Sequence, residues 1–151
     1  MIREHEEIAI LVVEDDPIDL EMTLRALQSD SVNNRIEVAR DGEEALDFLF
    51  CRGAFSGRSI DAQPKLILLD LKLPKVDGLE VLREIRARPE TRGVPVVVLT
   101  SSAEQRDIVE TYKLGVNSYI QKPVDSAQFQ QTVKAAGFYW LLVNRRPLVH
   151  A

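Results

Sequence analysis

Five short apolar runs alternate along the chain with stretches in which apolar residues recur at helical spacing. The runs are residues 8–13, 36–39, 66–69, 94–99 and 118–120. Pro17 follows Asp16 just after the first run, a pair that suits an N-cap and the first turn of a helix. Because parallel strands are joined by crossover helices, this alternation predicts an α/β domain with a doubly wound parallel sheet.

Capping-box patterns predict where three further helices begin. They pair an Asp or Ser with a Glu three residues later: Asp41 with Glu44, Asp77 with Glu80, and Ser101 with Glu104. The last helix should begin after Asp125 and carry Phe129, Val133, Ala136 and Trp140 on one face. Residues 52–64 form a long polar loop inside the domain, either functional or a tolerated insertion.

Composition excludes several classes of protein. The chain has 151 residues, which suits one domain, and its net charge of -5 argues against a nucleic-acid surface. Its apolar runs are too short to span a membrane or to form a secretion signal. Cys51 is the only cysteine, so no disulfide can form within the chain, and we expect a cytoplasmic protein.

Polar residues follow four of the expected strands at the point where each strand ends. They are Glu14, Asp15 and Asp16 after the first, Asp70 after the third, Thr100 and Ser101 after the fourth, and Lys122 after the fifth. The carboxyl ends of parallel strands meet at one edge, so these side chains should converge. Neighbouring carboxylates repel one another unless a cation neutralises them, and oxygen ligands favour Mg²⁺.

The same cluster suits phosphate chemistry. Lys122 supplies a positive charge and Thr100 a hydroxyl, both suited to a phosphoryl oxygen, so that Asp70 can act as the nucleophile. Zinc is not expected, because Cys51, His5 and His150 lack ligand spacing. Each residue alone has a simpler role as a helix cap or a solvated lysine, and Asp16 is expected to be a cap. Their combination favours the phosphoryl site.

Four segments resemble the receiver domain of bacterial two-component response regulators. They are "ILVVEDDP", "LILLDLKLPKVDGLEVL", "VPVVVLTSS" and "LGVNSYIQKPV". Asp70 and Thr100 are 30 residues apart, and Thr100 and Lys122 are 22 apart, as in that family. The resemblance implies a flavodoxin-like (βα)5 fold with sheet order 2-1-3-4-5. It also implies a receiver domain over residues 1–144, a tail over 145–151 and no output domain.

The resemblance assigns a role to each site residue. Asp70 would be the phosphoacceptor, Asp15 the direct Mg²⁺ carboxylate and Glu14 a ligand through water, and the backbone carbonyl of Lys72 would complete the metal site. Thr100 and Lys122 would contact the phosphoryl group, and Tyr119 would be the switch aromatic. The "KP" match also predicts a cis bond between Lys122 and Pro123.

A narrower resemblance points to single-domain response regulators that are paired with bacterial phytochrome kinases and are common in cyanobacteria. It rests on the insertion at 52–64 and the ending "FYWLLVN". Those proteins often carry Asn where this chain has Lys72. A sensor histidine kinase, with a phytochrome as the candidate, is therefore the expected phosphodonor.

A homodimer is also expected. A helix over residues 137–144 would be apolar nearly all round, so one face can pack on the sheet while another is left for a partner. The predicted interface uses this helix and the strand-five side. Alternatively, Phe138, Tyr139 and Trp140 only cap the core.

The sequence favours a stand-alone phosphoacceptor that signals through protein contacts and is not an enzyme. An aspartyl-phosphate hydrolase of the haloacid dehalogenase type is the first alternative, but its D-x-D motif needs an acid where Lys72 stands. A degenerate receiver that only binds partners is the second. Glycine-rich nucleotide-binding loops are absent.

Overall fold

The computed structural model describes residues 8–28, 35–122 and 126–138. Within them a five-stranded parallel sheet has the order β2-β1-β3-β4-β5, as predicted. The strands are β1 (Ile10–Val13), β2 (Ile36–Ala39), β3 (Leu66–Leu69), β4 (Val96–Thr100) and β5 (Ser118–Gln121). The helices are α1 (Pro17–Gln28), α2 (Gly42–Leu49), the 3-10 helix η2 (Gly53–Phe55), α3 (Gly78–Ala87), α4 (Gln105–Lys113) and α5 (Ser126–Phe138).

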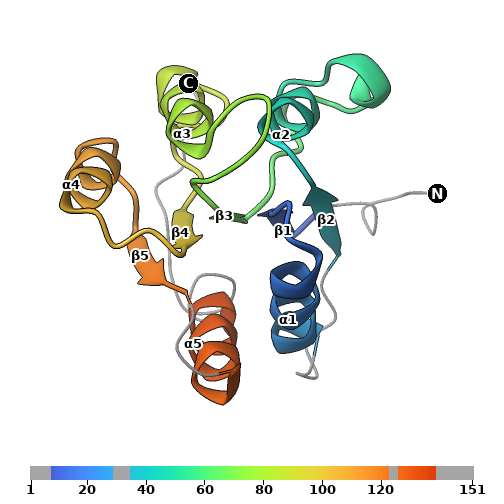
Figure 1. Ribbon diagram of the computed structural model, residues 1–151. Helices are drawn as coiled ribbons and strands as arrows, with labels where there is room; N and C mark the ends of the chain where they lie inside the picture. The colour runs from blue at the N-terminus through green and yellow to red at the C-terminus, as the bar shows by residue number, and fades with distance from the viewer. Residues whose placement is uncertain (1–7, 29–34, 123–125, 139–151) are drawn as a thin grey trace.

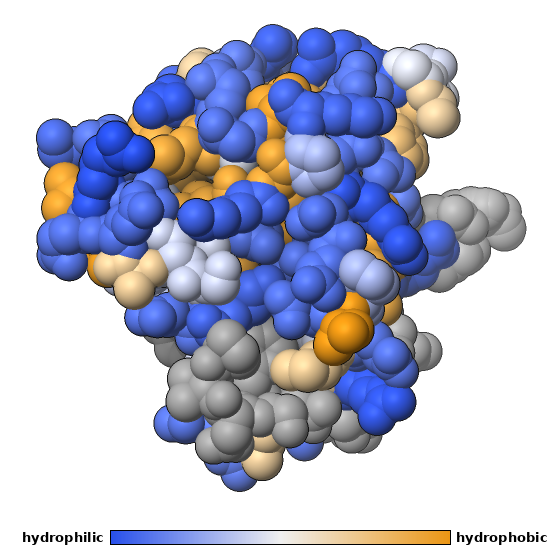
Figure 2. Space-filling view, in the orientation of Figure 1, coloured by the Kyte–Doolittle hydropathy of each residue, from blue (hydrophilic) through white to orange (hydrophobic). Residues whose placement is uncertain are grey.

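Helices cover both faces of the sheet. In Figure 1, α1 and α5 lie below it and α2, α3 and α4 above. Successive strand residues face opposite layers: Leu11 and Val13 belong to the α2–α3 core, whereas Ile10 and Val12 belong to the α1–α5 core. The central strands β1 and β3 are buried on both faces, which explains why they are apolar throughout rather than alternating. The surface in the same orientation is largely hydrophilic, and hydrophobic side chains show in places between the polar ones (Figure 2).

Proline and capping residues decide where the elements begin. The amides of Ile18 and Asp19 donate to Asp16 Oδ1 at 2.8 and 3.2 Å, so Asp16 caps α1 as predicted. Asp41 and Asp77 cap α2 and α3, also as predicted. The fourth apolar run was expected to form a strand from residue 94, but β4 begins at Val96, because Pro95 has no N–H to donate to the sheet.

The prediction that Ser101 and Glu104 open a capping box was wrong. Helix α4 begins at Gln105, and Glu104 is its N-cap residue without a side-chain cap bond. The reason is that Ser102 organises this loop instead. Its Oγ accepts from the amide of Glu104 at 3.2 Å and donates to Asp107 at 2.6 Å, which keeps the chain out of the helix until residue 105.

Residues 52–64 are more ordered than the polar loop that the sequence predicted. They contain η2, and the ring of Phe55 meets that of Phe48 edge to face at 5.2 Å. The guanidinium of Arg58 lies 3.7 Å from the centroid of the Phe48 ring and donates to the carbonyls of Phe48 and Ala62. The segment therefore packs on the outer side of α2.

Some predictions concern residues outside the described part of the chain. These are the helix over 139–144 with Tyr139 and Trp140, the Lys122–Pro123 bond, and the faces of Phe129 and Ala136. Helix α5 begins at Ser126, as predicted, and Val133 is buried on it. Among the described residues no helix is both long and apolar enough to cross a membrane.

Candidate functional site

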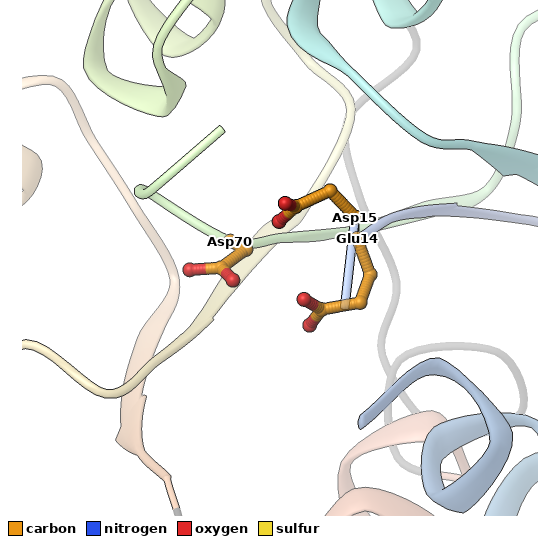
Figure 3. Close-up of side chains that lie close together, drawn as sticks. All are labelled: Glu14, Asp15 and Asp70. Carbon is orange, nitrogen blue, oxygen red and sulfur yellow. The ribbon is translucent and has the colours of Figure 1, made fainter. Parts of the chain in front are cut away.

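Glu14, Asp15 and Asp70 gather at the carboxyl ends of two adjacent strands, β1 and β3. The amide of Glu14 donates to Ala39 O at 3.0 Å and that of Asp70 to Val13 O at 3.1 Å, so hydrogen bonds between neighbouring strands continue into the site. One carboxylate oxygen from each of the three residues lies within 4.8 Å of the others. Figure 3 shows the three side chains directed into one space. The predicted convergence is confirmed for these residues.

The donor set suits a hard divalent cation. Three carboxylates at this separation offer oxygen ligands alone, and Mg²⁺ and Mn²⁺ prefer oxygen to nitrogen or sulfur. Glu14 and Asp70 are buried and Asp15 is exposed, so the site is open to water on one side. The residues present therefore fit a metal that keeps some of its water ligands.

Lys122 enters the same cluster from the end of β5. Its ammonium donates to Glu14 Oε1 at 2.7 Å, to Asp19 Oδ2 at 2.8 Å and to Asp70 Oδ2 at 3.3 Å. Only 3% of the Lys122 side chain is exposed. A buried ammonium needs such compensation, because an unpaired charge in the interior is strongly unfavourable.

Asp19 is a site residue that the sequence reasoning missed. It lies in the first turn of α1 rather than at a strand end, so the rule that located the other acids did not reach it. The signal that could have found it is position: helix α1 follows the acidic end of β1 directly, which places its first turn beside the site.

Burial governs the ionisation of the buried pair. Desolvation raises the pKa of Glu14 to about 8, even though the hydrogen bond from Lys122 favours the charged carboxylate. Burial alone would lower the pKa of Lys122, but its hydrogen bonds to Asp19 and Glu14 outweigh that effect and raise it. Lys122 is therefore a permanent cation at neutral pH, while Glu14 can exchange its proton for a metal ion.

Thr100 and Tyr119 meet at Ser102, which follows the end of β4. Thr100 is fully buried, and its Oγ1 accepts from the amide of Ser102 at 3.3 Å. The hydroxyl of Tyr119, on β5, donates to the carbonyl of Ser102 at 2.9 Å. Thr100, which is predicted to contact the phosphoryl group, and Tyr119, the predicted switch aromatic, are thus joined through Ser102.

Lys72 and Gly78 define the loop that follows Asp70. The amide of Lys72 donates to Asp70 Oδ1 at 3.2 Å, and the Lys72 side chain is exposed at the rim. The metal-binding role of its carbonyl stays a prediction. Gly78, which the sequence reasoning also missed, begins α3 and donates to Leu71 O at 2.9 Å.

Comparison with known proteins identifies the family. The family model for the response regulator receiver domain matches residues 10–134. The chain belongs to this family. The receiver fold and its sheet order, both expected from the sequence, are confirmed. As a member of this family, the chain is a signalling protein of the two-component type.

Three relatives match this receiver over most of their own length. FilR2, a probable methanogenesis regulatory protein of Methanothrix harundinacea, is 43% identical, over 91% of this chain and 86% of that protein. The phosphorylated cyanobacterial phytochrome response regulator RcpA has a TM-score of 0.86 and 39% identity, over 94% of this chain and 99% of that chain. The Mn²⁺-bound response regulator Rcp1 of Synechocystis has a TM-score of 0.85 and 35% identity, over 93% of this chain and 99% of that chain. Rcp1 thus binds a divalent metal ion, and this chain has three clustered carboxylates whose spacing would suit one.

Proposed function

We propose that Asp70 accepts a phosphoryl group from the phosphohistidine of a sensor histidine kinase, in a site that holds Mg²⁺. The observation that carries this proposal is the meeting of three carboxylates with the buried ammonium of Lys122 at one sheet edge. Glu14, Asp15, Asp70 and the backbone carbonyl of Lys72 would hold the ion. When bound, Mg²⁺ neutralises the acids and draws in the phosphate oxygens.

The chain's own residues supply the positioning. A carboxylate oxygen of Asp70 attacks phosphorus while the bond between phosphorus and the kinase histidine breaks in line. Lys122 lies 3.3 Å from Asp70 and offers a fixed positive charge to the equatorial phosphoryl oxygens. The Thr100 hydroxyl is a donor for another of these oxygens. Little covalent catalysis is needed, because positioning and electrostatics supply most of the acceleration.

The phosphoryl group then shifts the equilibrium between two conformations of the loop after β4. If Thr100 turns its hydroxyl towards the phosphoryl oxygen, its bond from the Ser102 amide is lost, and Ser102 also holds the hydroxyl of Tyr119. The loop after β4 therefore couples the phosphorylation site to the α4–β5 surface. We propose that the signal leaves by protein contacts on that surface.

A phytochrome is the proposed kinase partner. RcpA is a phytochrome response regulator and is similar to this chain over nearly its whole length, which supports the assignment that the 52–64 insertion suggested.

A homodimer through the strand-five side is part of the same proposal. Val109 and Tyr112 on α4 are 43% and 53% exposed, and large apolar side chains in such positions favour an interface. We further propose a receiver over residues 1–144 and a cytoplasmic location, which suits the single free cysteine, Cys51.

A haloacid dehalogenase-like hydrolase is the less favoured function. Such an enzyme needs a general acid two residues after its nucleophile, where this chain carries Lys72 with an exposed ammonium-bearing side chain. A degenerate receiver is disfavoured because each expected phosphorylation residue is present. We therefore propose that the protein accepts a phosphoryl group on its own Asp70 and does not hydrolyse a separate substrate.

Treatment with acetyl phosphate and Mg²⁺ tests the proposal. We expect one hydroxylamine-sensitive acyl phosphate per chain, and borohydride reduction followed by peptide mass spectrometry should locate it at Asp70. EDTA should prevent labelling, because the cluster of acids repels an anionic donor. Absence of any label in the presence of Mg²⁺, or a label on another residue, would contradict the assignment.

Mg²⁺ binding should release a proton from Glu14. Because the pKa of Glu14 is raised to about 8, Glu14 is largely protonated at pH 7 when no metal is bound, and the cation must displace that proton. The affinity for Mg²⁺ should therefore rise with pH and level off above about pH 8. Calorimetric titrations in buffers of different ionisation enthalpy should give about one proton per ion at pH 6.5. An affinity that is constant from pH 6 to 8 would contradict this expectation.

A further inference from the structure

The ammonium of Lys122 is fully occupied in this structure. It carries three N–H donors, and oxygens of three acidic side chains accept them: Glu14 at 2.7 Å, Asp19 at 2.8 Å and Asp70 at 3.3 Å. A phosphoryl oxygen that arrives at Asp70 therefore needs one of these hydrogen bonds to be given up. Which bond is exchanged decides how readily Lys122 can serve the phosphoryl group.

Asp19 differs from the other two partners in its surroundings. Its side chain is 28% exposed, whereas those of Glu14 and Asp70 are 3% and 8% exposed. Water can solvate the Asp19 carboxylate once it lets go of Lys122, but a released Glu14 would remain buried. An unpaired buried polar group carries a large penalty, so the Asp19 bond can be exchanged at less cost than the Glu14 bond.

Asp19 also draws the Lys122 ammonium towards α1 and away from the acidic cluster. It belongs to the first turn of α1 and is not part of the acidic cluster that suits a metal. The Lys122 ammonium lies 0.5 Å closer to Asp19, at 2.8 Å, than to Asp70, at 3.3 Å. The charge that the proposed phosphoryl chemistry uses is thus held partly towards the helix.

We propose that Asp19 is a positioning residue that draws Lys122 towards α1 and competes with the phosphorylation site for its ammonium. The inference rests on the proposed function, in which Lys122 neutralises the phosphoryl group on Asp70. It adds a regulatory role at the same site, because the Asp19 carboxylate slows phosphoryl uptake by Asp70. Removal of its carboxylate leaves one N–H of Lys122 free for a phosphoryl oxygen.

The Asp19→Ala variant tests this competition. With acetyl phosphate and saturating Mg²⁺, we expect its rate constant for phosphoryl uptake to rise about fivefold over that of the wild type. Asp19→Glu, which restores a carboxylate, should stay closer to the wild type. Glu21→Ala is the matched control, because Glu21 lies on the same helix, is exposed and pairs with Arg25 instead. Its rate constant should stay within about twofold of the wild type.

A double-mutant cycle separates competition for Lys122 from a general field effect. If Asp19 acts through Lys122, Asp19→Ala should leave the residual rate of a Lys122→Met protein unchanged. The same acceleration in that background would overturn the inference, because the loss of a nearby negative charge would then explain it alone. An unchanged or slower uptake by Asp19→Ala in the native background would also overturn it.

The ammonium signal of Lys122 gives a readout that does not depend on phosphorylation or on the Lys122→Met variant. In ¹⁵N-lysine-labelled protein, this buried group should show a protected ¹H–¹⁵N signal. Asp19→Ala should shift the signal and speed its hydrogen exchange, and Glu21→Ala should not; an unmoved signal would overturn the inference. A wild type that takes up no phosphoryl group would refute the proposed function, whereas a labelled wild type with an unaffected Asp19→Ala refutes only the role of Asp19.

Discussion

The Asp70→Asn variant should lose phosphoryl uptake at this site by at least about a hundredfold. An amide oxygen is a far weaker nucleophile than a carboxylate, and the amide also removes one charge from the metal cluster. The fold should survive and even gain stability without metal, because the negative charge of Asp70 disfavours the charged form of Glu14 and helps to raise its pKa. Intact mass spectrometry after treatment with acetyl phosphate and Mg²⁺ measures the loss.

Asp16→Asn is the matched control for that variant. Asp16 adjoins Asp15 in the chain, but it caps α1 and lies outside the acidic cluster. Asn is as good an N-cap as Asp, so the helix should be retained and uptake should stay within about threefold of the wild type. Labelling of Asp70→Asn at the wild-type rate would rule out Asp70 as the acceptor. An equal loss of uptake in both variants would show that Asp16 also belongs to the acidic cluster.

The sheet could be predicted because its central strands are buried on both faces. Runs such as Leu66–Leu69 are wholly apolar, with helical patterns on either side, and only a parallel sheet between two helical layers buries such strands completely. Once the strands are parallel, their carboxyl ends share one edge. The convergence of Glu14, Asp15, Asp70 and Lys122 then follows from the order of the residues alone.

The features that escaped prediction depend on contacts between distant segments. Asp19 joins the site because Lys122, 103 residues later, reaches back to α1. Helix α4 starts late because Ser102 bonds to Asp107 and holds Tyr119, so a local capping pattern was overridden. Arg58 packs on the ring of Phe48 and so orders a segment that looks polar and irregular in sequence. Local patterns contain no information about these partners.

Gly78→Ala should destabilise the protein by about 3 kcal/mol or more and disturb the site at the same time. A Cβ at this position would lie 2.3 Å from the carbonyl oxygen of Asp70 and 2.4 Å from the Cα of Leu71. Both are backbone atoms, so no rotamer change can relieve the overlap. The start of α3 would have to move away from the loop that holds the proposed phosphoacceptor. Urea unfolding measures the stability, and uptake from acetyl phosphate by the folded fraction should be slower.

Gly57→Ala isolates this steric effect from the general effect of replacing glycine. A Cβ at Gly57 would meet nothing within 4 Å, and the residue is exposed in the 52–64 segment. Alanine restricts the unfolded chain equally at both positions, so Gly57→Ala should change the stability by no more than about 1 kcal/mol, with any change stabilising. Equal stabilities for the two variants would mean that α3 can shift freely against the Asp70 loop. A loss confined to Gly78→Ala would instead show that close packing of α3 on this loop fixes the position of Asp70.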